Sequence, residues 1–146
     1  MLAQAHLAAM EDYFAGWNSG DLDLLCRHLA DGFLLESDAL REPVHGRETM
    51  RQFAARFLRA FPDLHFRLED TFASDTMVTV QWVATGTHTG PLDDTPPTQR
   101  RIRLHGCTVA SFEGDQVQRT RVYWDASTLR RQIGLPSEPE PAPPTA

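Results

Sequence analysis

The residues best suited to proton transfer lie where the last long predicted strand ends, at Asp125. Arg121 and Tyr123 precede Asp125 at alternate positions, so on an extended strand the three side chains point to the same face. Aromatic walls would raise the pKa of this carboxyl and make it a better general base near neutral pH, whereas Arg121 would lower the pKa. The alternative is that Asp125 caps a helix beginning near Ser127, and the residues alone favour this cap.

Two histidines on neighbouring predicted strands are the other candidates for chemistry. His88 ends a strand within the run GTHTG, and His105 lies on the next strand, with Cys107 on the same face. Either imidazole could donate a hydrogen bond to a substrate carbonyl as charge builds on an enolate oxygen, or could hold the backbone as a structural histidine. The six histidines form no HxH or HExxH pattern, so we expect no metal site.

Aromatic side chains recur at positions that a substrate pocket would use. They could wall an apolar pocket for a flat polycyclic ligand, although such stripes more often form plain core. The candidates are Tyr13, Phe14 and Trp17 in a first helix, Phe53 and Phe57 in a third, and Trp82 in a strand.

Asp70 is an exception on its predicted strand, because it shares the parity of Leu68 and Phe72 on the apolar face. A carboxylate there needs a partner or a purpose. It is either a second pocket carboxylate or a residue that a β-bulge turns outward, and we favour the bulge.

The elements that must position these residues follow from apolar periodicity. A period of three to four residues precedes a period of two along the chain. The predicted elements are helices at 3–17, 22–29, 46–61 and 127–133 and strands at 33–36, 64–72, 76–88, 100–112 and 116–124. Helices followed by a strand meander predict an α+β fold, with the N-terminal helices packed on a mainly antiparallel sheet. Gly86 and Gly106 inside strands predict bulges or bends that curve this sheet strongly around a pocket.

Composition limits the classes of protein. The chain has 146 residues, of which 41% are hydrophobic and 23% are charged, as in a soluble globular protein. We expect one domain over 1–135 and a disordered proline-rich tail over 136–146. A net charge of −6 argues against a nucleic-acid partner, and no apolar run approaches the roughly 20 residues that span a membrane. Without a signal peptide, Cys26 and Cys107 are expected to be reduced thiols of a cytoplasmic protein.

Several short pieces of the sequence, taken in order, resemble the SnoaL-like polyketide cyclases. The resemblance covers about residues 5–135 and rests on FPDLHF at 61–66, GTHTG at 86–90, PPT at 96–98, the hairpin over 112–117 and YWD at 123–125.

This resemblance implies an NTF2-like cone and a homodimer or higher oligomer, without a metal or organic cofactor. It implies an intramolecular aldol closure of a hydrophobic polyketide in antibiotic or other secondary metabolism. Asp125 would be the general acid/base, with His88 and His105 as catalytic partners. The substrate-binding residues would be Tyr13, Trp17, Phe53, Phe57, Trp82, Arg121 and Tyr123.

Other functions remain open on the same fold. They are a pyran-forming or cycloaddition-type cyclase, an isomerase of the ketosteroid type, a cofactor-independent hydroxylase, a non-catalytic ligand-binding protein and an NTF2-like association module.

Overall fold

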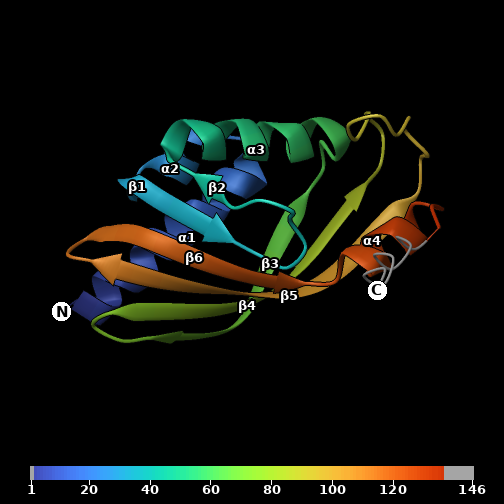
Figure 1. Cartoon of the computed structure of the whole chain (residues 1–146). Helices are drawn as coiled ribbons and strands as arrows, with labels where there is room; N and C mark the ends of the chain where they lie inside the picture. The colour runs from blue at the N-terminus through green and yellow to red at the C-terminus, as the bar shows by residue number, and fades with distance from the viewer. Residues whose placement is uncertain (1, 137–146) are drawn as a thin grey trace, which may run out of the picture.

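The computed structural model describes residues 2–136, which form four helices and one six-stranded sheet (Figure 1). The elements are α1 (Leu2–Ser19), α2 (Leu22–Cys26), β1 (Leu29–Glu36), β2 (Val44–His45), α3 (Arg47–Ala60), β3 (His65–Ala73), β4 (Met77–Thr87), β5 (Arg101–Glu113), β6 (Gln116–Trp124) and α4 (Ala126–Gln132). The disorder predicted for the tail concerns residues that, apart from Pro136, lie outside the described part of the chain.

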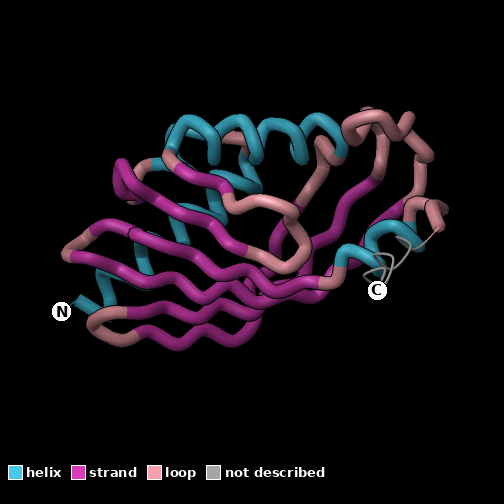
Figure 2. Tube along the Cα trace, viewed as in Figure 1, coloured by secondary structure: helices cyan, strands magenta, loops and turns pink. Residues whose placement is uncertain are grey.

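The strands lie in the order β2-β1-β6-β5-β4-β3. Neighbours are antiparallel except β1 and β6, which are parallel. The sheet curls without closing, and α1 and α3 lie over its concave side (Figures 1 and 2). The α+β prediction of helices on a bent, mainly antiparallel sheet is confirmed.

The first helix shows how the apolar pattern creates the core. Along α1, the side chains at steps of three and four are buried against the sheet, whereas Gln4 and Glu11 face solvent. The buried side chains include His6, Met10, Tyr13, Phe14 and Trp17. This face brings three aromatic rings over the strands, where the candidate site lies.

A bulge in β3 decides the direction of Asp70. The pairing of β3 with β4 shifts register between Leu68 and Thr71, and Asp70 is exposed. The predicted bulge is therefore confirmed. The same shift turns Phe72 outward, opposite Thr79, so its predicted inward direction is wrong and its side chain is 73% exposed.

Three predictions of local structure are corrected. The second helix ends at Cys26, and Leu29 starts β1, because Leu29 pairs with Val117 and both side chains are buried in the core. The short strand β2 lies where no helix or strand was predicted. The glycines inside β4 and β5 mark no bulge, since the pairing of these strands is continuous from Met77 to Thr87.

Gly106 has a packing role instead. A Cβ atom at Gly106 would lie 2.2 Å from the ring of Trp82 on the neighbouring strand. The missing side chain therefore makes room for this indole, which lies against β5 and lines the cavity.

Candidate functional site

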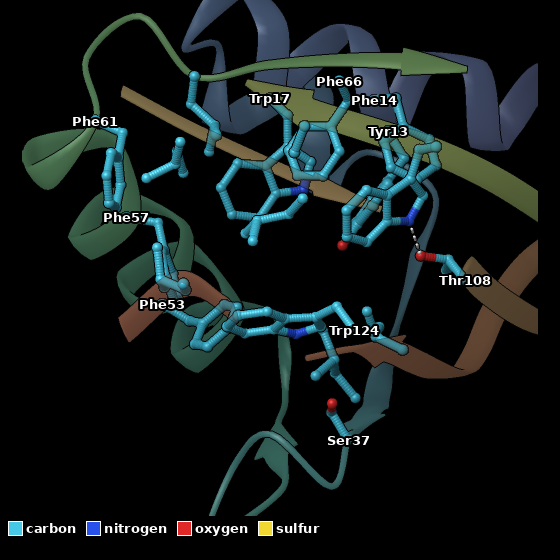
Figure 3. Close-up of a pocket in the computed structure, with 18 of the residues that line it drawn as sticks. Tyr13, Phe14, Trp17, Ser37, Phe53, Phe57, Phe61, Phe66, Thr108 and Trp124 are labelled. Carbon is cyan, nitrogen blue, oxygen red and sulfur yellow. Dashed lines mark hydrogen bonds between the residues drawn. The ribbon is translucent and has the colours of Figure 1, made fainter. Parts of the chain in front are cut away.

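An apolar cavity of about 90 Å³ lies between the helices and the concave face of the sheet (Figure 3). None of its nineteen lining residues is Asp, Glu, His, Lys or Arg, and nine are aromatic. The lining consists of Tyr13, Phe14, Trp17, Leu35, Ser37, Leu40, Phe53, Phe57, Phe61, Leu64, Phe66, Trp82, Ala84, Ile102, Leu104, Thr108, Val122, Trp124 and Leu129.

Five of the seven residues predicted to bind substrate lie on this lining. Helix α1 contributes Tyr13 and Trp17, α3 contributes Phe53 and Phe57, and β4 contributes Trp82. The rings come from elements far apart in the sequence because α1 and α3 cover the same face of the sheet. Their role in binding a substrate stays a prediction.

Polar atoms in the lining are few. The indole Nε1 of Trp82 donates a hydrogen bond of 3.0 Å to Oγ1 of Thr108, so two of these polar atoms are partners of each other. Burial raises the pKa of Tyr13 to about 12. The side chain of Trp17 lowers this pKa by a smaller amount. At neutral pH the phenol of Tyr13 therefore stays protonated and can donate a hydrogen bond.

The cavity is small for a polycyclic ligand. Drug-sized ligands occupy pockets of about 300–1,000 Å³, several times the volume found here. Half-buried side chains form part of the wall, among them Phe53, Phe57 and Trp124. A larger ligand would have to displace these side chains, whereas a single ring needs less movement.

Asp125 does not line this cavity, and the prediction that its carboxylate faces the pocket is wrong. Its side chain is exposed and caps α4, accepting hydrogen bonds from the amide N of Ser127 at 2.9 Å and from Oγ1 of Thr128 at 3.1 Å. The hydrogen bonds from Thr128 and Ser127 hold the pKa of Asp125 below its ordinary value. A low pKa stabilises the carboxylate and makes it a weaker base.

The direction of β6 explains this error. Arg121 and Tyr123 share the face of Asp125, as predicted, but this face is the outer one, and both side chains are exposed. Val122 and Trp124 point into the cavity instead. Thr120 shares the parity of these two residues and, being polar, makes their face look like the outer one in the sequence, yet Thr120 is fully buried. Val122 and Trp124 are thus the cavity residues that periodicity missed.

Two further lining residues, Ser37 and Leu40, come from the segment after β1, where no helix or strand was predicted. Their approach to the cavity depends on the position of the loop, for which the sequence carries no periodic signal. In the sequence, the apolar Leu40 was the available indication that this segment contributes a side chain to the core.

His88 is buried but does not line the cavity. Its Nδ1 accepts a hydrogen bond of 3.2 Å from the amide N of Thr98 and lies 2.9 Å from Oγ1 of the same residue. Burial lowers the pKa of His88, so the ring is neutral at neutral pH, with its proton on Nε2. In this position the imidazole links the segment before β5 to the end of β4. His88 therefore has the structural role that was the alternative to a catalytic one.

His105 lies on the outer face of the sheet and is exposed. It borders a shallow hollow together with Cys107, Tyr123 and Glu69. The structure therefore places His105, Arg121, Tyr123 and Asp125 apart from the apolar cavity. It brings none of the three predicted catalytic residues to the cavity wall.

Among residues 2–136, no group of three or more His, Cys, Asp or Glu side chains could hold a metal ion. No helix within this range is long and apolar enough to cross a membrane.

The family model for SnoaL-like polyketide cyclases matches residues 7–133, almost the whole described domain. The chain belongs to this family. A search of curated proteins finds no match.

Solved structures with the same fold include members of this family. A protein from Jannaschia sp. CCS1, proposed to be a SnoaL-like polyketide cyclase, is 23% identical with a TM-score of 0.83, and the match covers 94% of this chain and 95% of that one. AclR from Streptomyces galilaeus, a proposed hydroxylase, is 23% identical with a TM-score of 0.79, covering 92% and 98%. IdmH from Streptomyces antibioticus, a proposed polyketide cyclase, is 21% identical with a TM-score of 0.75, covering 88% and 98%. At these identities the likeness establishes the NTF2-like fold.

Proposed function

We propose that this SnoaL-like protein closes a ring in a neutral, apolar polyketide-type substrate by confining it in the cavity, without a protein carboxylate as base. The observation that carries the proposal is the lining, in which nine aromatic rings and no carboxylate, imidazole or cation surround the space. A flat conjugated chain suits such walls, whereas a charged one would lose its hydration without gaining a partner.

A cycloaddition-type closure fits this environment best. Two carbon–carbon σ bonds form from two π bonds within one molecule, no proton leaves the substrate, and no co-reactant is required. The catalytic task is then to hold the two reacting ends in contact, and well-oriented intramolecular reactions gain roughly 7–11 kcal/mol from such positioning. Aromatic walls are suited to it once the half-buried rings Phe53, Phe57 and Trp124 have moved to admit the substrate.

A second candidate is the aldol closure through Asp125. The observation in its favour is that Asp125 lies in the chain between two cavity residues, Trp124 and Leu129, so its backbone runs beside the cavity, and the exposed carboxylate would have to turn inward to act. In that reaction the carboxylate removes an α-proton, the enolate carbon bonds to a carbonyl carbon, and the alkoxide takes the proton back. The composition of the substrate is unchanged in both reactions.

The replacement of Asp125 by Asn separates the two candidates. Asn is as good a helix cap as Asp, so D125N keeps the fold and loses the base. Linear and partly cyclised aromatic polyketides are incubated with each protein, and ring formation is followed as a product of unchanged mass with new carbon–carbon bonds by NMR. We expect D125N to turn over within a few-fold of the wild type. A loss of at least ~10²-fold, the usual scale of general acid/base catalysis, would favour the aldol mechanism.

The same incubations test the remaining functions. Recovery of every bound polyketide unchanged would point to a ligand-binding protein, and oxygen uptake with a gain in mass would point to a hydroxylase. Either result would overturn the ring-closure proposal.

We also propose a homodimer that joins two copies through the outer faces of their sheets. Large apolar side chains are exposed there, with Phe72 at 73% and Tyr123 at 53% exposure. Burying them between two copies would remove this apolar surface from water. Light scattering of the wild type and of F72D tests the dimer, and a monomeric wild type would refute it.

A further inference from the structure

Phe53 and Phe57 form a ring pair in the part of the cavity wall that α3 provides. They lie one helical turn apart, their ring centroids are 5.1 Å apart in an edge-to-face arrangement, and both side chains are only half-buried. Figure 3 shows both rings at the border of the cavity. A substrate larger than the cavity gains space when this ring pair swings away.

Arg56 lies over both rings without lining the cavity itself. Its guanidinium carbon is 5.1 Å from the ring centroid of Phe57 and 5.5 Å from that of Phe53. A guanidinium at such a distance is attracted to the negative charge on the face of an aromatic ring. One cation therefore holds both members of the ring pair in their present positions.

Asp93 anchors this guanidinium from the loop between β4 and β5. Its Oδ1 is 3.7 Å from Nε of Arg56, which is the distance of an ion pair without a hydrogen bond. The loop is itself attached to the end of α3, because the amide N atoms of Thr89 and Gly90 each donate a hydrogen bond of 3.1 Å to the carbonyl O of Ala60. The position of Asp93 relative to Arg56 is therefore set by the fold.

The present arrangement of Arg56 also carries a cost. Its Nε atom is buried and has no hydrogen-bond partner among the described residues, although 41% of the whole side chain is exposed. A buried donor without a partner loses free energy that water would restore. Movement of the ring pair would hydrate this N–H as the cation–π contacts break. The free-energy difference between the closed and the open wall is therefore smaller than the contacts alone suggest.

We propose that Arg56 is a positioning residue that keeps Phe53 and Phe57 in the cavity wall, and that release of its contacts is the step that admits a ligand. The inference rests on the proposed function, because it concerns how a substrate reaches that cavity, and it adds a selection by size. A one-ring ligand enters and the ring pair closes again behind it. A ligand of several fused rings keeps the ring pair displaced, so its affinity is reduced by the loss of the Arg56 contacts.

The rates of acetophenone binding test this role. Acetophenone is neutral and has one ring, and stopped-flow quenching of the three tryptophans, all of which line the cavity, follows its entry. R56M keeps an unbranched side chain but removes the cation. We expect R56M to bind and release acetophenone faster by a similar factor, about 3- to 30-fold, with a dissociation constant within about 2-fold of the wild type. A merely structural role would change stability without changing both rates together.

The affinity for a larger ligand gives a second readout. Fluorenone is also a neutral ketone, but it has three fused rings. R56M should bind fluorenone about 3- to 30-fold more tightly than the wild type does, whereas the equilibrium binding of acetophenone should stay the same. Equal affinities of the two proteins for fluorenone would overturn the selection by size.

R59M controls for a general effect of charge, since it removes a cation from the same helix. Arg59 is exposed and, within residues 2–136, neither pairs with a carboxylate nor lies over an aromatic ring. R59M should bind both probes as the wild type does, and an acceleration equal to that of R56M would contradict the proposal.

D93N removes the anchor and keeps the test decisive even if R56M folds poorly. Asn tolerates the left-handed φ of 50° at this position, so the loop is preserved. D93N should raise both rates for acetophenone by a smaller factor than R56M. Wild-type rates in D93N would count against the anchor and, in the absence of a folded R56M, against the proposal.

Failure of this inference is distinguishable from failure of the proposed function. If both probes bind to the wild type and R56M shows wild-type rates and affinities, the role of Arg56 is wrong and the cavity remains the binding site. If neither probe binds to the wild type, the cavity is not a ligand site, and the proposed function is wrong as well.

Discussion

The two faces of β6 differ sharply, although their residues alternate along one strand. Inward, Val122 and Trp124 complete an apolar wall, and outward, Arg121 and Tyr123 lead to the exposed carboxylate of Asp125. The protein's two tyrosines show the same contrast, because Tyr13 is buried at the cavity and Tyr123 is 53% exposed.

The residues with obvious acid/base chemistry and the residues around the cavity therefore belong to separate surfaces. A carboxylate next to aromatic residues in the sequence is not desolvated when the strand turns it to solvent. Hydrogen bonds at a helix N-terminus then lower its pKa instead of raising it. Any chemistry in the cavity must therefore use uncharged polar groups that can be buried, such as hydroxyls and indoles.

The largest expected effect comes from filling the cavity from β6. V122F adds a ring to the inner wall, and R121F adds the same ring to the outer face one residue away. Because overpacking of a filled site costs about 1–3 kcal/mol, V122F should weaken acetophenone binding by about 5- to 100-fold, as measured by calorimetry. R121F is the control and should bind as the wild type does; equal weakening by both variants would contradict the assignment of the faces.

A smaller effect is expected from the buried hydroxyl of Thr120. Its Oγ1 has no hydrogen-bond partner among the described residues, although the residue is fully buried. T120V removes this unsatisfied group at constant shape and should raise the free energy of unfolding by about 1 kcal/mol in urea titrations. The matched variant T79V alters a half-buried threonine of the outer face and should change little. Destabilisation by T120V would indicate a partner for the hydroxyl.

The smallest effect concerns the cap at Asp125. D125A removes the hydrogen bonds to α4 and should lower the midpoint of thermal unfolding at neutral pH, whereas D125N should not. Since the folded-state pKa of Asp125 lies below its ordinary value, the carboxylate stabilises the fold above the unfolded pKa, and this stabilisation is lost as pH falls through the folded pKa. The deficit of D125A should therefore shrink in acid. A constant deficit from neutral to acidic pH would argue against the cap.

Periodicity predicted most of this fold because burial repeats with the geometry of each element. The aromatic stripe of α1 and the alternation along β4 are long and regular, so the helices and the antiparallel strands could be placed. The bulge at Asp70 was predictable as well, because a carboxylate at an apolar parity needs an explanation.

The candidate site was harder to predict, for physical reasons. Both faces of β6 carry polar residues, so the sequence does not show which face points inward. Thr120 is polar but buried, and its polarity makes the inner face look like the outer one. The family resemblance then drew attention to Asp125, whose local role as a cap had been the better inference from the residues. Side chains on the loop after β1 reach the cavity through tertiary placement alone.

The most direct test of the central claim, that ligands occupy the inner cavity, is an NMR titration of ¹⁵N-labelled protein with acetophenone. All three tryptophans line the cavity, so their indole N–H signals report on it without any substitution. We expect the signals of Trp17, Trp82 and Trp124 to shift together as the probe is added. Shifts confined to the backbone amides of His105, Arg121, Tyr123 and Asp125 would place the site on the outer face and contradict the account.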